Sequence, residues 1–355
     1  MSAGRADRLV AKLAERELDA LLVTNLVNVR YLSGFTGTNA VCVVTPNDRL
    51  FLTDFRYVER AKQEVPDFER LRGKQDLLAD AAERLTGRVG FEDQHMTVRQ
   101  HKRLEELAPE GVELVAAGGL VEDLRAVKEE GELRAIREAA DLADDIYEYL
   151  CSRGLVGRTE REVALDLERE MRERGAEDPS FPSIIAGGPH GALPHADPRP
   201  VRIDANTLVI VDMGCIVDGY CSDCTRTFAT GELSDEAAGV YELVLAAQQE
   251  SLAAIHAGAE CRAVDSIARE RIAEAGHGDH FGHGLGHGVG LEIHEAPRLA
   301  QSSEGTLAAG NVVTVEPGVY LPGAFGVRIE DLVIVTDEGS QVLSHFPKSL
   351  ITLGA

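Results

Sequence analysis

The chain has 355 residues, of which 44% are hydrophobic and 27% are charged, which is ordinary for a soluble globular protein. Its formal net charge of −24 argues against nucleic acid and anionic membrane surfaces as partners, because like charges repel. No segment approaches the roughly 18 apolar residues of a membrane span, and the charged N-terminal stretch lacks the apolar core of a signal peptide. We therefore expect a cytoplasmic protein, and the length favours two domains.

Roughly the first 120 residues alternate helical and extended patterns, which indicates a small α/β domain. The turn residues Pro46, Asn47 and Asp48 separate two of the expected strands. We expect residues 33–40, SGFTGTNA, to form a connection. The expected strands are 19–24, 40–45, 49–54, 88–92 and 112–117, and the expected helices lie near 5–17, 55–65, 76–86 and 97–107.

A change of character marks the start of a second domain. Residues 121–150 carry apolar side chains at helical spacing and predict one long, charged helix. We place the domain boundary near 120–128 and expect one domain at 1–122 and another at 123–355.

The second domain combines helical and strand patterns. Thr159, with Glu162 three residues later, has the signature of a capping box and opens a helix expected at about 159–174. Two more helical patterns lie at about 234–257 and 262–275, among segments with strand and turn patterns. This order indicates an α+β domain in which helices pack against an antiparallel sheet.

The six cysteines are too few for a disulfide framework in a chain of this length. Cys221 and Cys224 form a CxxC pair, but no second pair completes a zinc site of four thiolates. Because Asp223 lies between them in a run with a strand pattern, we do not favour a redox or zinc role for this pair.

The stretch Gly282–Glu295, GHGLGHGVGLEIHE, combines three histidines with a glycine at every second position of its first nine residues. Each glycine would cost about 1 kcal/mol in a helix interior, so this is not a helical HExxH zinc site. An extended strand would place His283 and His287 on one face together with Leu285 and Val289. The bare glycine backbone suits a metal or a substrate that approaches closely.

Two aspartates occupy a predicted hairpin at positions where the pattern predicts core. The turn Asp218-Gly219 is a strong hairpin signal. A two-residue turn there pairs Asp223 with Gly214 and makes Asp212 its diagonal neighbour on the same face. The two carboxylates would then reach one shared ligand.

Two glutamates show the same anomaly. Glu316 ends the strand pattern VVTVE, and Glu330 lies within GVRIEDLVIV. A buried ionised carboxylate is costly unless it is paired or bound to metal. Singly, each acid has an ordinary interpretation, such as a turn or cap residue or an ion pair between Glu330 and Arg328. Together with His287, the four carboxylates form a ligand set whose charge balances two divalent cations.

The ordered motifs VDMGCIVDGYCSDCTRTF, GHGLGHGVGLEIHE, TVEPGVY and GVRIED closely resemble the pita-bread metallopeptidases, the family of Xaa-Pro aminopeptidases, prolidases and methionine aminopeptidases. The resemblance covers about residues 125–350. The N-terminal segment looks like the creatinase-type domain of the proline-directed members, which methionine aminopeptidases lack. Cys224 departs from the apolar residue expected in the first motif.

The resemblance implies a dinuclear metal site in the second domain, with a pita-bread fold. Asp223 and Glu330 correspond to the ligands that bridge two cations. The implied ligands are Asp212, Asp223, His287, Glu316 and Glu330. Because carboxylates with one imidazole form a hard ligand set, Mn²⁺ is expected, with Co²⁺, Fe²⁺ or Zn²⁺ as alternatives.

The resemblance also implies roles for side chains that are not metal ligands. His195, His283 and His294 match histidines that hold the substrate and the tetrahedral intermediate. Arg328 matches an arginine near a metal-bound aspartate. Tyr320 matches a tyrosine of the family motif, for which a packing role is an equal alternative.

The activity that we expect first is that of an Xaa-Pro aminopeptidase, which releases the N-terminal residue from peptides with proline second. A hydroxide bridging the two metals would attack the peptide bond, and Glu316 would transfer a proton to the leaving nitrogen. The creatinase-type domain suggests a homodimer by analogy.

Two alternatives remain. A prolidase cleaves only Xaa-Pro dipeptides and must bind the free C-terminal carboxylate, typically through an arginine. Arg298 is the only arginine between His294 and Glu316, and on this basis we rank prolidase second. A metal-free or non-catalytic binding member of the same fold ranks last, because such members are expected to have lost ligands.

Overall fold

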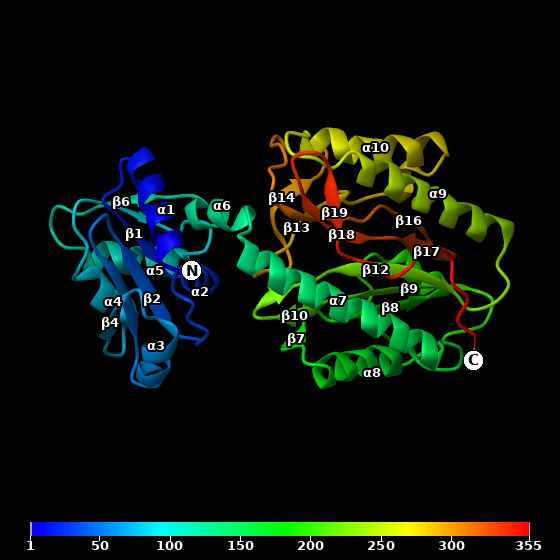
Figure 1. Ribbon diagram of the computed structural model, residues 1–355, viewed down its shortest axis with the longest axis horizontal. Helices are drawn as coiled ribbons and strands as arrows, with labels where there is room; N and C mark the ends of the chain where they lie inside the picture. Colours follow the sequence, from blue (N-terminus) through cyan, green and yellow to red (C-terminus); the bar gives the residue numbers. More distant parts are fainter. Residues whose placement is uncertain (1, 355) are drawn as a thin grey trace. The chain divides into compact units, whose positions relative to one another are not determined.

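The computed structural model describes residues 2–354, and contacts divide the chain into two compact units, Met1–Arg125 and Ala126–Ala355, here called the N-terminal and C-terminal units (Figure 1). The boundary expected after residue 122 lies inside helix α6 (Leu120–Ala126) and stays a prediction. Within the described residues, no helix has both the length and the apolar character needed to cross a membrane.

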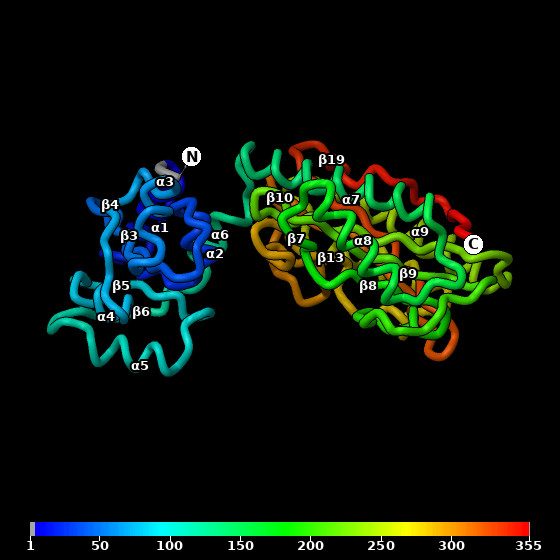
Figure 2. The backbone as a smooth tube through the Cα atoms, turned by 90° about the horizontal axis from the view of Figure 1, so that it is seen from below, coloured from blue at the N-terminus to red at the C-terminus, as the bar shows by residue number. Residues whose placement is uncertain are grey.

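The N-terminal unit is an α/β domain around a six-stranded mixed sheet. Its elements are α1 (Ser2–Glu15), β1 (Ala20–Val23), α2 (Leu26–Ser33), β2 (Ala40–Val44), β3 (Arg49–Thr53), α3 (Val58–Glu64), β4 (Glu69–Arg72), α4 (Leu77–Ala82), β5 (Arg88–Phe91), α5 (Val98–Leu107), β6 (Glu113–Ala116) and α6. The strand order is β4-β3-β2-β1-β5-β6, with β1 antiparallel to β2 and parallel to β5. Figure 2 shows α5 along one edge of this unit. The ring of His101 on α5 lies 4.7 Å from that of Phe91 on β5, measured between centroids. All the strands and helices predicted here are present.

Two elements of this unit escaped sequence prediction. Helix α2 is short, and its start depends on Asn25, whose side chain accepts a hydrogen bond from the backbone N–H of Val27. Strand β4 is an edge strand of charged, mostly exposed residues. Neither has the apolar periodicity on which sequence prediction relies.

The C-terminal unit places its strands between two pairs of helices (Figure 1). Its helices are α7 (Glu130–Arg153), α8 (Glu160–Glu173), η1 (Gly188–Ala192), α9 (Asp235–Ala253), α10 (Cys261–Glu274) and η2 (Gly278–His280). Its strands are β7 (Asp178–Pro179), β8 (Ile184–Gly187), β9 (Leu208–Met213), β10 (Cys215–Val217), β11 (Tyr220–Cys221), β12 (Cys224–Ala229), β13 (Gly286–Gly288), β14 (Glu295–Leu299), β15 (Val312–Val315), β16 (Gly318–Leu321), β17 (Phe325–Arg328), β18 (Asp331–Val335) and β19 (Ser340–Val342). They form the sheets β12-β9-β8, β11-β10-β7, β14-β13-β15-β18-β19 and β16-β17, whose pairs are antiparallel.

Each helix pair closes a hydrophobic core against the strands. Tyr147 of α7 and Leu167 of α8 pack in one buried cluster with Val211 of β9. Val244 of α9 and Val313 of β15 belong to a second cluster, under α9 and α10. The α+β architecture predicted for the second domain is confirmed.

The single helix predicted over residues 121–150 is wrong, because the chain leaves the helical path between α6 and α7. The backbone N–H of Lys128 donates to Gly310 O, at 2.9 Å, instead of continuing a helix. The Lys128 side chain is buried and forms an ion pair with Glu295, Nζ to Oε2 3.1 Å. Helix α7 then restarts with a capping box of Glu129 and Glu132. A tertiary contact therefore overrides helical spacing that is continuous in the sequence.

The hairpin that carries the two aspartates is confirmed. Asp218 and Gly219 have φ values of 53° and 78°, and Val217 pairs with Tyr220 across the turn. The same register continues into β9 and β12, where Asp212 pairs with Thr225. Asp223 and Asp212 are therefore diagonal neighbours, as the two-residue turn predicts.

Helix α8 offers a test of local stability. Thr159 Oγ1 accepts from the N–H of Glu162 at 3.1 Å, and the Glu162 carboxylate accepts from the N–H of Thr159 at 2.8 Å. We predict that Thr159→Ala lowers the free energy of unfolding by about 1 kcal/mol, because it leaves a helix N–H without its cap. Chemical denaturation followed by circular dichroism measures the shift. Thr159→Ser keeps the hydroxyl and should shift little; equal losses for both variants would contradict a capping role.

Candidate metal centre

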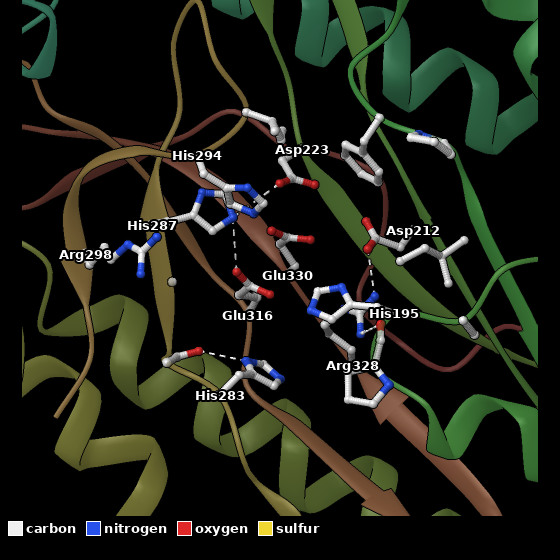
Figure 3. Close-up of a pocket in the computed structure, with 18 of the residues that line it drawn as sticks. His195, Asp212, Asp223, His283, His287, His294, Arg298, Glu316, Arg328 and Glu330 are labelled. Carbon is white, nitrogen blue, oxygen red and sulfur yellow. Dashed lines mark hydrogen bonds and ion pairs between the residues drawn. The ribbon is translucent and has the colours of Figure 1, made fainter. Parts of the chain in front are cut away.

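All the predicted site residues line one pocket of the C-terminal unit (Figure 3). They come from segments far apart in the sequence and converge where the β9–β12 hairpin meets β13, β15 and β17. They are His195 in the loop after η1, Asp212 on β9, Asp223 before β12, His283 and His287 around β13, His294 before β14, Glu316 after β15, Arg328 at the end of β17 and Glu330 before β18.

Three buried carboxylates form the centre of this cluster. Asp212, Asp223 and Glu330 each offer an oxygen within 4.8 Å of the other two. Burial, followed by the charges of Glu330, Asp212 and Glu316, raises the pKa of Asp223 well above its usual range. Burial and the charge of Glu316 likewise raise the pKa of Glu330. The ionised cluster therefore requires additional positive charge.

Two oxygens of the cluster are buried and have no hydrogen-bond partner among the described residues. These atoms are Asp212 Oδ1 and Glu330 Oε1. Buried polar atoms are normally satisfied, so such orphans call for an explanation such as an ion. Carboxylate oxygens are the donors that hard divalent cations prefer, and the cluster fits such cations.

The ring of His287 also indicates that a cation binds at this cluster. Its Nδ1 lies 3.0 Å from Gly288 O, and burial lowers its pKa to about 4, so the ring is neutral at pH 7 with its proton on Nδ1. The bare Nε2 then faces Glu316 Oε1 at 3.3 Å and Asp223 Oδ2 at 3.6 Å. A lone pair that faces two carboxylate oxygens is repelled unless a cation lies between them. This tautomer suits a metal ligand.

Arg328 supplies the fixed positive charge at one side of the cluster. Its guanidinium donates to Asp212 Oδ2 at 2.6 Å, to Tyr320 Oη at 2.8 Å and to Pro194 O at 3.1 Å. Burial opposes its charge, but Tyr320 and Asp212 outweigh burial and raise the pKa of Arg328. Its bond to Pro194 also holds the loop that carries His195.

The three remaining histidines differ in their surroundings. His195 and His294 are exposed in the pocket, and the His294 ring lies 4.3 Å from the His287 ring, measured between centroids. His283 is tied down: Nδ1 lies 2.8 Å from Gly284 O, and Nε2 lies 2.9 Å from Tyr320 Oη. Burial lowers the pKa of His283 to about 4. The roles of all three toward a substrate stay predictions.

The long glycine–histidine strand expected from the sequence is wrong. Only Gly286–Gly288 forms a strand, and a bulge between His287 and Gly288 breaks the alternation of faces. His283 and His287 line the pocket, whereas Leu285 and Val289 are buried in two hydrophobic clusters. The expectation that all four residues share one face is therefore corrected.

The glycines also serve a different purpose from the one expected. A Cβ at Gly286 would lie 2.0 Å from Thr314 O, and one at Gly288 would lie 2.2 Å from Ala296 O. These glycines let the neighbouring strands approach β13 closely, which brings His287 to the carboxylates. The group that approaches these glycines in the structure is this chain's own backbone, and close approach of a metal or a substrate stays a prediction.

Two threonines that hold the ligands were missed in the sequence. Thr225 Oγ1 donates to Glu330 Oε2 at 2.7 Å, and Thr314 Oγ1 donates to Glu316 Oε1 at 3.1 Å. Thr225 lies two residues after Asp223 and Thr314 two residues before Glu316, so strand alternation offered a signal for both.

The antiparallel sheets between helix pairs, with a buried cluster of acids and one imidazole, define the class of pita-bread metallopeptidases. The model of metallopeptidase family M24 matches residues 134–337, and that of the creatinase/prolidase N-terminal domain matches residues 5–127. The chain therefore belongs to metallopeptidase family M24, and the resemblance stated from its motifs is confirmed.

Individual relatives span nearly the whole chain. An Xaa-Pro dipeptidase of Pyrococcus furiosus is 36% identical over 98% of this chain and 99% of its own. The structure of an Xaa-Pro dipeptidase from Bacillus anthracis matches with a TM-score of 0.96 at 39% identity, over 99% of this chain and 100% of its own. An X-Pro aminopeptidase from Thermotoga maritima matches with a TM-score of 0.87 at 34% identity, over 96% and 99%.

The glycine run permits a test of the strand approach. We predict that Gly286→Ala forces β13 away from Thr314, lowers the free energy of unfolding by about 1–3 kcal/mol and weakens divalent-metal binding by displacing His287. Denaturation and metal titration measure the two effects. Gly282→Ala is the matched control, because no atom lies within 4 Å of its added Cβ. Equal behaviour of the two variants would contradict this explanation of the glycines.

Proposed function

We propose that this protein is an Xaa-Pro dipeptidase that hydrolyses the bond before proline with the help of two divalent cations. Arg298, whose side chain lines the pocket beside the metal cluster, carries the choice of a dipeptidase over an aminopeptidase. The proposal reverses the ranking drawn from the sequence alone.

The proposed ligands are those expected from the sequence. Asp212, Asp223, His287, Glu316 and Glu330 would together hold the two cations. The orphaned oxygens of Asp212 and Glu330 and the bare Nε2 of His287 support this assignment. Because the donors are mainly carboxylates, we propose Mn²⁺ as the cation, with Co²⁺, Fe²⁺ or Zn²⁺ as alternatives.

The side chains around the cluster supply proton transfer and orientation. When bound, two divalent cations lower the pKa of a shared water and polarise a carbonyl oxygen. Without bound cations, burial raises the pKa of Glu316 to about 7, with Arg328 opposing that shift; a bound cation would favour its ionised form. We assign to Glu316 the transfer of a proton to the leaving nitrogen. His294 and His195, exposed in the pocket, would orient the substrate carbonyls together with His283, whose Nε2 lies 2.9 Å from Tyr320 Oη.

The pocket also offers groups suited to a short substrate that ends in proline. Phe181, Ile184 and Ile293 line it and provide an apolar wall for a pyrrolidine ring. Arg298 pairs with His287 across β13 and β14, so the two side chains lie on one face. Among residues 2–354, no carboxylate lies within ion-pair distance of its guanidinium. The free C-terminal carboxylate of a dipeptide would be its partner.

The aminopeptidase remains the second candidate. It is supported by the likeness to the Thermotoga maritima X-Pro aminopeptidase. A peptide with a third residue would present a neutral amide to Arg298 in place of a carboxylate, which would leave the guanidinium unpaired. A metal-free binding member ranks last, because all five ligands converge. A cytoplasmic location and a homodimer stay predictions.

Product analysis decides between the two peptidases. We expect wild-type protein to cleave Xaa-Pro dipeptides, and to cleave Xaa-Pro-Xaa tripeptides or dipeptide amides at least tenfold more slowly. Arg298→Gln should raise KM for the dipeptide about 10–100-fold, as expected for losing a charge-assisted contact, and should change tripeptide cleavage little. Chromatography of the products measures both. Tripeptide cleavage equal to dipeptide cleavage in wild type would favour the aminopeptidase.

Metal removal tests the ligand assignment separately. We predict about two transition-metal ions per chain in protein purified without chelator, measured by mass spectrometry. Dialysis against chelator should abolish hydrolysis and lower the melting temperature, because bound cations stabilise only the folded state. Adding Mn²⁺ back should restore both. Full activity in metal-free protein would contradict the proposed chemistry.

A further inference from the structure

Residues 281–285 carry His283 into the pocket without forming a strand or a helix. Gly282 and Gly284 flank this histidine, and glycine has the widest backbone freedom of any residue. Beyond its chain neighbours, no atom of the described residues lies within 4 Å of a Cβ placed on Gly282, whereas a Cβ on Gly284 would lie 2.8 Å from Leu299 O. The orientation of His283 therefore depends on contacts that other elements make with this segment.

One ion pair on α10 makes most of the hydrogen bonds from other elements to the backbone of this segment. Asp265 and Arg269, one helical turn apart, pair in a bidentate manner, Nε to Oδ2 at 2.8 Å and NH2 to Oδ1 at 2.9 Å. The same guanidinium donates to Phe281 O at 3.0 Å and to His283 O at 2.8 Å. Asp265 Oδ1 accepts from the N–H of Leu285 at 3.0 Å. The pair therefore forms hydrogen bonds to the backbone of three alternate residues, Phe281, His283 and Leu285.

The Phe281 ring connects the Arg269 guanidinium to the imidazole of His283. The Arg269 guanidinium carbon lies 4.4 Å from the centroid of the Phe281 ring. The Phe281 ring meets the His283 ring edge-on, with centroids 5.1 Å apart and an interplanar angle of 89°. Beyond the α10 pair, the described residues make one further backbone hydrogen bond to this segment from outside it, from the N–H of Glu316 to Leu285 O at 2.8 Å.

The ion pair is largely buried and lies close to His283 but outside the lining of the pocket. The Asp265 side chain is 0% exposed and the Arg269 side chain 19% exposed, so both charges are largely shielded from solvent. Neither residue is among those that line the pocket within the described part of the chain. Arg269 uses Nε, NH1 and NH2 in these bonds, which a lysine could not reproduce.

We propose that the Asp265–Arg269 pair is a positioning device that orients His283 for the peptidase reaction. The inference rests on the proposed function, because it assigns His283 a part in hydrolysis. It goes further, in that two residues outside the pocket act on the catalytic rate through this histidine. A pair that only fastened α10 to the sheet would contribute stability without any dependence on His283.

The first test compares two arginines of the same helix. Arg269→Met removes the hydrogen bonds of the guanidinium to Asp265, Phe281 and His283. We expect kcat/KM for an Xaa-Pro dipeptide to fall about 10–100-fold, the loss typical of a displaced catalytic group. Arg271→Met is the matched control, because Arg271 forms an exposed pair with Glu250 at 2.9 Å and, within the described part of the chain, no hydrogen bond or ion pair joins its side chain to residues 281–285. It should change kcat/KM less than about twofold. Metal content and melting temperature are measured for both. Equal activity of the two variants would overturn the proposal.

A double-mutant cycle then separates positioning from stability. In a His283→Ala background, Arg269→Met should change kcat/KM less than about twofold, because the group it positions is already gone. An undiminished loss in that background would overturn the proposal. Arg269→Lys keeps the charge beside Asp265 but loses the multiple bonds, so it should give an intermediate rate and serves as the test variant if Arg269→Met does not fold. Wild-type protein without Xaa-Pro hydrolysis would refute the proposed function instead.

Discussion

The site depends on one constraint: the carboxylates of Asp212, Asp223 and Glu330 are buried together, and the chain does not supply enough positive charge to balance them. A neighbouring acid shows what a compensated charge looks like in this fold. Asp331, fully buried, accepts from Arg226 at 3.0 Å, from Gln248 at 3.0 Å and from Lys348. Glu330, one residue earlier, has a single partnered oxygen and an orphan. The chain supplies cations to the first acid and leaves the second for cations from outside, which is the arrangement of a metal site rather than of a structural network.

The rest of the unit brings the ligands to this point and holds them there. The tight turn at Asp218 and Gly219 fixes a register in which Asp212 and Asp223 are diagonal neighbours. The glycines of β13 allow the backbones of Thr314 and Ala296 to pack closely against this strand, which brings His287 next to the carboxylates. Precision of this kind comes from main-chain geometry, because strands hold side chains more rigidly than loops do.

The sequence contained the ligand set but not every reason for its geometry. Asp212, Asp223, Glu316 and Glu330 were visible because carboxylates at core positions conflict with the surrounding pattern, and the glycine–histidine stretch supplied His287. The break before α7 was not visible, because it depends on the burial of Lys128 against Glu295, far along the chain. The bulge at His287 was equally hidden, since only pairing with β14 creates it. Local pattern therefore predicted elements and candidate ligands, while tertiary contacts decided where strands end and which way side chains turn.

Chemistry and specificity are divided between the inside and the rim of the pocket. The metal-ligand candidates Asp212, Asp223 and Glu330 are buried, and replacing any of them would change the charge of the core. Arg298 and His294 are exposed on and beside β14, where a substitution alters the pocket without disturbing the core. Relatives that cover nearly all of this chain carry both dipeptidase and aminopeptidase names. Under the proposed function, the buried cluster would supply the chemistry and the exposed rim would decide the substrate. Under that proposal, the choice between a dipeptide and a longer peptide would depend on whether the exposed guanidinium of Arg298 finds a carboxylate.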